Sequence, residues 1–144
     1  MRALLDVNVI IALLDSKHVF HRRAHSWWAT NGKIGWASCP LTENAVVRIM
    51  SNPNYDRLHR FSIGDLIGQL RDFIQKTDHQ FWADDISILN NSLFEADRIH
   101  SPKQITDLYL LALATKHGGR LVTFDQNISL STLKGARAEN LSVA

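Results

Sequence analysis

A helix, a pair of glycines and a strand follow one another near the C-terminus, and this unit constrains the fold more than any other part of the sequence. Residues 107–117 are almost wholly apolar over the length of a helix, and Gly118-Gly119 is a typical helix stop. The apolar run at 120–124 then has the length of a buried strand. A strand that follows a helix in this way is typical of a parallel sheet, whose strands are joined by helical crossovers.

The same alternation extends over the rest of the chain. Further short strands are predicted at residues 3–5, 34–38, 80–82 and 141–143. Further helices are predicted at residues 8–14, 18–30, 42–52, 62–74 and 87–99, and the predicted N-caps are Asn8, Thr42, Ser62 and Thr106. We therefore expect one α/β domain over residues 1–144, with a mostly parallel central sheet flanked by helices on both faces.

Composition excludes several classes of protein. Hydrophobic residues make up 45% of the 144 positions, which is enough for a core. The formal net charge of +2 permits nucleic-acid binding without arguing for it. Cys39 is the only cysteine, so no internal disulfide is possible, and we expect it to be a small buried side chain. The apolar N-terminal run is interrupted by Asp6 and Asn8, and no run is long enough to span a membrane, so we expect a cytoplasmic protein.

Most of the 14 acidic residues lie on polar helix faces or in loops, but four lie among apolar neighbours: Asp6, Glu43, Asp107 and Asp125. Asp6 and Asp125 follow predicted strands, at the edge of a parallel sheet where ligand sites form. Glu43 and Asp107 fall in first turns of predicted helices, where the helix dipole alone is a sufficient explanation for either one.

Four carboxylates at one edge would repel one another unless a cation neutralised them. Mg²⁺ prefers oxygen ligands of this kind, and Mn²⁺ is a possible substitute. The seven histidines show no zinc-like pairing. The spacing of His18, His21 and His25 places them on one helical face, where they could bind a metal, contact RNA or be ordinary surface residues. No glycine-rich phosphate loop is present.

The segments LLDVNVIIALLD, LTENAVVRIM and ITDLYLLALATKHGGRLVTFD, in this order, resemble PIN-domain nucleases, and in particular the VapC-type toxins of bacterial toxin–antitoxin pairs. The resemblance extends over nearly the whole chain. It implies a Rossmann-like PIN fold, a magnesium-dependent endoribonuclease that acts as the toxin of a type II pair, and inhibition by a VapB-type antitoxin.

Carried over residue by residue, the family's catalytic acids fall on Asp6, Glu43, Asp107 and Asp125, with supporting positions at Asn8, Thr106 and Thr123. The metal ligands implied are Asp6, Asp107 and Asp125. Asn127 stands where some relatives have a further acid, which favours one firmly held ion over two. The hypothesis is that the ion lowers the pKa of a water that attacks an RNA phosphodiester, while Glu43 or a second ion assists.

Several assignments stay open at this point. Arg22, Arg23 and Arg48 are candidate phosphate contacts, although each is more simply a solvated charge. Of the adjacent Trp27 and Trp28, one is expected in the core and the other at a dimer or antitoxin interface, with stacking on an RNA base as a third and less favoured alternative. A homodimer is the default assembly. The alternatives are a PIN-fold RNA-binding or scaffold protein without activity, and a haloacid-dehalogenase-type phosphatase, which Asn8 argues against because that class needs a second aspartate there.

Overall fold

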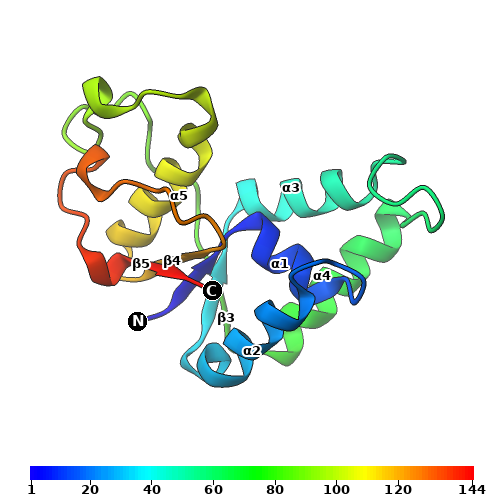
Figure 1. Ribbon diagram of the computed structural model, residues 1–144. Helices are drawn as coiled ribbons and strands as arrows, with labels where there is room; N and C mark the ends of the chain where they lie inside the picture. Colours follow the sequence, from blue (N-terminus) through cyan, green and yellow to red (C-terminus); the bar gives the residue numbers. More distant parts are fainter.

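A computed structural model describes all 144 residues and contains one five-stranded sheet, in which every strand pair is parallel. The strand order is β3-β2-β1-β4-β5, so β1 lies at the centre, between β2 and β4 (Figure 1). The strands are β1 (Ala3–Leu5), β2 (Trp36–Ser38), β3 (His79–Phe81), β4 (Arg120–Thr123) and β5 (Leu141–Val143). The prediction of a mostly parallel sheet is confirmed.

Helices cover both faces of this sheet, as the alternation predicts. They are α1 (Val7–Leu14), α2 (His21–Asn31), α3 (Pro40–Met50), α4 (Ile63–Lys76) and α5 (Ile105–Lys116). Side chains of Ala3 and Leu5 pack with α1 to α4, whereas Leu4 packs with α5 on the other face. The longest helix has 14 residues, and no helix is long and apolar enough to cross a membrane.

The two adjacent indoles both contribute to the core. Trp27 and Trp28 are half-buried against the layer of α1 to α4, so neither faces fully outward. The ring of Trp28 meets the rings of Trp36 and Phe73 at centroid distances of 6.3 and 5.2 Å. The ring contacts of Trp28 agree with the expectation that one indole packs in the core. The interface expected for its neighbour stays a prediction.

Three of the predicted N-caps are displaced. Helix α1 begins directly after β1, and its N-cap is Asp6 instead of Asn8. Helix α3 begins at Pro40 with Cys39 as N-cap, so Thr42 lies in the first turn. Thr106 lies within the first turn of α5, which begins at Ile105. Ser62 is confirmed, because its hydroxyl accepts a hydrogen bond from the Asp65 N–H at 3.1 Å.

The predicted helix at residues 87–99 is wrong. This segment consists of turns and one short 3₁₀ helix, Ala96–Arg98. The side chains of Ser87 and Asn90 accept hydrogen bonds from backbone N–H groups two residues further on, and such local bonds compete with helix formation. Phe94 is nevertheless buried and forms an antiparallel bridge with Leu133, so the segment is anchored to the layer of α5.

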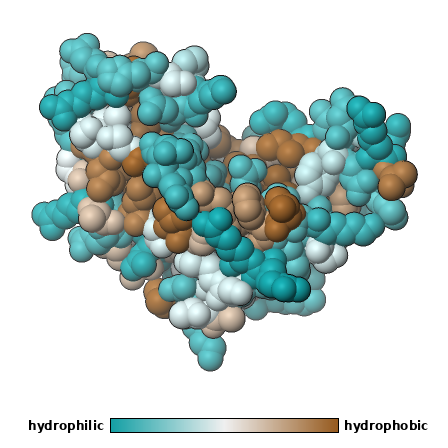
Figure 2. Space-filling model, viewed as in Figure 1, coloured by the Kyte–Doolittle hydropathy of each residue, from teal (hydrophilic) through white to brown (hydrophobic).

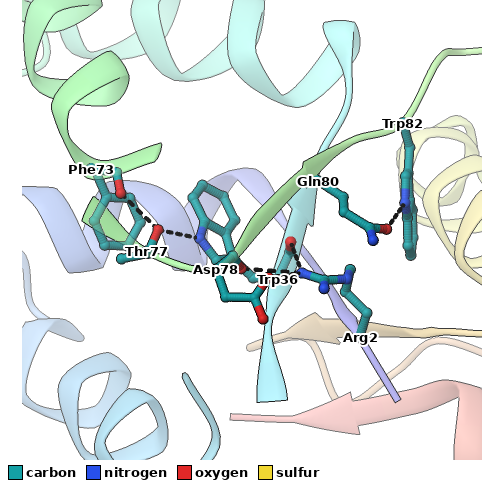
Figure 3. A network of polar contacts seen from close by, with 7 residues as sticks. All are labelled: Arg2, Trp36, Phe73, Thr77, Asp78, Gln80 and Trp82. Carbon is teal, nitrogen blue, oxygen red and sulfur yellow. Dashed lines mark hydrogen bonds and ion pairs between the residues drawn. The ribbon is translucent and has the colours of Figure 1, made fainter. Parts of the chain in front are cut away.

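The amino ends of three strands are joined by a polar network (Figure 3). The Arg2 guanidinium donates to the carbonyls of Trp36 and Asp78, each at 3.1 Å, and forms a 2.9 Å ion pair with the Asp78 carboxylate. The Trp36 indole donates to the Thr77 hydroxyl at 2.8 Å. Gly35 has a φ of 93° and leaves room for the guanidinium, which any Cβ there would overlap.

Candidate active site

Three of the four predicted acids meet at the carboxyl edge of the sheet. Asp6 follows β1, Asp125 follows the neighbouring strand β4, and Asp107 lies in the first turn of α5. All three line one cavity of about 640 Å³. The molecular surface is notched between the lobe of α5 and the arm formed by α3 and α4 (Figure 2), and residues of α1, α3, α5 and β4 line the cavity.

Thr123 connects two of these acids. Its hydroxyl donates to the Asp6 carboxylate at 2.8 Å and accepts the Asp125 N–H at 3.1 Å. The other carboxylate oxygen of Asp6 accepts the Val7 N–H at 2.7 Å, at the start of α1. Asp6 is only 7% exposed, so these bonds fix a buried carboxylate in one orientation. Thr123 therefore contacts two of the predicted acids, and its supporting role in the site stays a prediction.

Burial and neighbouring charge raise the pKa of two of these acids, Asp107 and Asp6. Burial raises the pKa of Asp107 to about 6, and the nearby carboxylates of Asp6 and Asp125 contribute to this rise. Burial also raises the pKa of Asp6, although its bonds to Thr123 and Val7 act in the opposite direction. None of the five ion pairs in the chain involves any of these three residues. The cavity therefore concentrates negative charge that no ion pair within the protein compensates.

Glu43 does not share this cavity. It lies in the first turn of α3, and its carboxylate accepts a 2.6 Å hydrogen bond from the hydroxyl of Ser38, the last residue of β2. Glu43 lines a neighbouring groove of about 870 Å³ between α3 and α4. Asn44 and Arg48 line both the groove and the acid cavity, so they form a shared wall on α3. The fourth predicted acid is thus adjacent to the other three but separate from them.

The remaining predicted residues divide into two groups. Asn8 and Thr106 line the acid cavity beside the aspartates, whereas Asn127 is exposed and donates its N–H to Asp125 at 2.8 Å. Arg48 lines the cavity as well. Arg23 instead donates to the Ala144 carbonyl. Asn44 is a cavity residue that the sequence pattern does not reveal, since an exposed asparagine within a helix is an ordinary surface residue.

The histidines of α2 have a structural explanation. His21 hydrogen-bonds the Ala12 carbonyl at 2.7 Å, and His25 hydrogen-bonds the Leu13 carbonyl at 3.1 Å. These carbonyls belong to the last turn of α1, where a helix has no partners of its own. Neither histidine lines the acid cavity. Cys39 is fully buried, as expected for a small core side chain.

The chemistry of the donors in the cavity suits a hard divalent cation. Carboxylates, with amide and hydroxyl oxygens beside them, are the ligands that Mg²⁺ and Mn²⁺ prefer. A cation would relieve the repulsion that, after burial, contributes to the raised pKa of Asp107. No three His, Cys, Asp or Glu side chains are arranged closely enough to form a ready ligand set. The three aspartates therefore line one cavity as chemically compatible donors, without forming a ready ligand set.

Comparison with known proteins settles the family. The family model described as "PIN domain" matches residues 3–131, which is most of the chain. The chain belongs to the PIN-domain family. Ribonuclease VapC44 of Mycobacterium tuberculosis is 47% identical over 142 residues, which cover 99% of both chains. Ribonuclease VapC39 of the same organism is 39% identical over 135 residues, 94% of this chain and 96% of that one. The resemblance to VapC-type PIN proteins is confirmed.

Solved structures support the same fold. The crystal structure of Mycobacterium tuberculosis VapC20, described as a sarcin-ricin loop cleaving toxin, has a TM-score of 0.58 at 13% identity and covers 94% of this PIN domain and 98% of that chain. VapBC2 of Rickettsia felis, solved with a DNA fragment from its promoter, has a TM-score of 0.56 at 12% identity and covers 100% and 99%. At such low identity these likenesses concern the arrangement of the elements alone.

Proposed function

We propose that this protein is a metal-dependent endoribonuclease and the toxin of a VapBC-type toxin–antitoxin pair. One observation carries the enzymatic part: Asp6, Asp107 and Asp125 converge in one cavity without any protein cation paired to them. The relatives named ribonucleases match this chain over nearly its whole length, which supports RNA as the substrate. An inactive RNA-binding or scaffold protein would have no use for one buried and two half-buried carboxylates in one cavity.

Under this proposal the three aspartates hold Mg²⁺, or Mn²⁺ in its place. When bound, such an ion activates water and offsets the charge of a phosphodiester. The hydrogen bond from Thr123 keeps the Asp6 carboxylate turned toward the cavity, and burial of that carboxylate limits its contact with solvent. Arg48, on the shared wall, contacts a phosphate of the RNA. Glu43 accepts a proton near the cavity from its position at the side of the groove.

The toxin role implies a protein partner that blocks this activity. A VapB-type antitoxin is the partner that the VapC relatives suggest. The groove between α3 and α4 supports such a partner, because half of its ten lining residues are apolar and it adjoins the cavity through Asn44 and Arg48. Binding there would bring a partner chain within reach of the aspartates. We also propose a homodimer, which measurement of the mass of the purified protein in solution would test.

The decisive experiment compares the protein with its Asp6→Asn variant on transfer RNA and ribosomal RNA, with Mg²⁺ and with chelator. Asparagine can still accept a hydrogen bond from the Val7 N–H through its side-chain oxygen, so the fold is retained. Cleavage only by the unmodified protein with Mg²⁺ is expected. Mg²⁺ should also raise the melting temperature of the unmodified protein and leave that of the variant unchanged. Equal cleavage by both proteins, or cleavage that persists in chelator, would refute the metal–carboxylate mechanism.

A further inference from the structure

A short chain of hydrogen bonds leads from Glu43 into the sheet. The Ser38 hydroxyl oxygen lies 2.6 Å from a Glu43 carboxylate oxygen and 2.7 Å from Nε2 of His79. Ser38 is fully buried, and Glu43 and His79 are each half-buried. Both contacts are short for hydrogen bonds of their type. The hydroxyl of Ser38 is buried and hydrogen-bonded to two polar side chains, so its position is fixed by the fold.

The register of the sheet explains why these residues meet. His79 of β3 pairs with Trp36 of β2, and Ser38 lies two residues further along β2 on the same face. The chain turns into α3 directly after Ser38, so Glu43 returns over the end of its own strand one helical turn later. Three short elements therefore bring an acid, a hydroxyl and an imidazole together.

Counting protons fixes the direction of the chain. An ionised carboxylate only accepts hydrogen bonds, so the one hydroxyl proton of Ser38 points to Glu43. The Ser38 oxygen must then accept from His79, which requires the imidazole to carry its proton on Nε2. Burial lowers the pKa of His79, and the positive charge of Arg2 lowers it further, so the neutral ring is favoured. The ring packs edge-on against Trp36 at 4.5 Å, which fixes its plane.

We propose that Ser38 and His79 are positioning residues that hold the Glu43 carboxylate beside the shared wall of the cavity and the groove, with one carboxylate oxygen occupied by Ser38 and the other left to accept a proton. This inference rests on the proposed ribonuclease function and assigns roles to two residues outside the aspartate cluster. A free glutamate side chain samples many rotamers, and the chain of bonds removes that freedom before substrate binds. His79 acts only through Ser38, at a distance from the RNA.

Kinetics of matched variants test the proposal. Ser38→Ala and His79→Leu should each lower kcat for RNA cleavage by about 5- to 10-fold and leave KM within about twofold, because substrate contacts are untouched. His79→Gln should restore most of the activity, since its amide nitrogen can donate from nearly the same place as Nε2. His100→Leu, at an exposed histidine, is the control and should behave like the unmodified protein.

A double-mutant cycle separates positioning from general damage. In a Glu43→Gln background, Ser38→Ala should lower kcat by less than about twofold, because the carboxylate that Ser38 serves is already gone. Independent, multiplying losses would overturn the proposal, as would an increase in kcat for Ser38→Ala alone. Full activity of Ser38→Ala alongside an inactive Asp6→Asn variant would refute this inference and leave the proposed function standing.

One readout needs no activity. Nitrogen-15 spectra of the imidazoles should show His79 as the Nε2–H tautomer in the unmodified protein, and Ser38→Ala should shift that signal toward a mixture of tautomers. An Nδ1–H tautomer in the unmodified protein would overturn the proposed chain of bonds. If the unmodified protein cleaves no RNA, the proposed function fails, and with it the positioning role, whereas this spectrum still decides whether the chain of bonds exists.

Discussion

The two edges of the sheet treat charge in opposite ways. At the amino edge, the guanidinium of Arg2 has a carboxylate partner in Asp78 and two carbonyl acceptors (Figure 3). At the carboxyl edge, Asp6, Asp107 and Asp125 form no ion pair, and burial, with a further contribution from neighbouring carboxylates, raises the pKa of Asp6 and Asp107. The charge at the amino edge is therefore paired within the protein, whereas the carboxylates at the carboxyl edge have no ion-pair partner.

This difference indicates where stability and where function are located. A satisfied network joins the amino ends of β1, β2 and β3, and its residues have no further task that the structure requires. Burying like charges costs free energy, and a fold keeps such charges where they serve a ligand or a reaction. Changes at the two edges should therefore have separable effects, on stability at one and on activity at the other.

The largest effect is expected at the carboxyl edge. Asp107→Asn should lower kcat/KM for RNA cleavage by on the order of 10²- to 10³-fold, the equivalent of about 3–4 kcal/mol, because the proposed mechanism uses this carboxylate as a metal ligand. Cleavage of a labelled RNA under single-turnover conditions measures this loss. The matched control is Asp97→Asn, at an exposed aspartate outside the cavity, which should retain full activity. Similar losses in both variants would mean that the cavity has no special role.

The amino edge should respond in stability alone. Arg2→Met removes an ion pair and two hydrogen bonds to carbonyls, and we expect a loss of about 1–2 kcal/mol and a fall in melting temperature of roughly 3–6 °C. Activity at about 25 °C should stay within roughly twofold. Lys76→Met breaks only an exposed ion pair within α4 and should cost less than about 0.5 kcal/mol, as thermal unfolding of both variants would show.

The sequence predicts the residues of the carboxyl edge better than those of the amino edge. An aspartate directly after an apolar strand is conspicuous, so the neighbours of Asp6 and Asp125 in the chain are enough to single them out, and the parallel alternation places them together. The Arg2–Asp78 pair spans 76 positions and joins two unremarkable surface charges, so no local pattern reveals it. The separation of Glu43 from the aspartates is likewise invisible, because it depends on a tertiary bond to Ser38.

The metal-free protein should lose stability as pH rises. The pKa of Asp107 is about 6 in the folded protein against an ordinary value of 3.8, so the folded state binds its proton more tightly than the unfolded state does. The contribution of Asp107 to the free energy of unfolding is therefore greatest below about pH 4, decreases between about pH 4 and 6, and stays low above about pH 6. In chelator, Asp107→Asn should therefore be more stable than the unmodified protein by ~1 kcal/mol at about pH 7, after screening by water, and equal to it near about pH 4. Thermal melts at both pH values measure this, and a constant difference would count against the repulsion.

The smallest effect concerns Arg48, the arginine that lines the acid cavity yet forms no ion pair. If Arg48 neutralises the aspartates, the carboxyl edge resembles the amino edge, and removal of Arg48 should destabilise the fold. If it is kept for substrate phosphate, Arg48→Gln should raise KM about threefold, leave kcat and the melting temperature unchanged, and reduce the salt dependence of RNA binding by about one counterion. Arg22→Gln, at an exposed arginine of α2 outside the cavity, is the control and should change none of these. A drop in melting temperature without a change in KM would instead show that Arg48 stabilises the fold by offsetting the charge of the aspartates. The charges at both edges would then be compensated within the protein, to different extents.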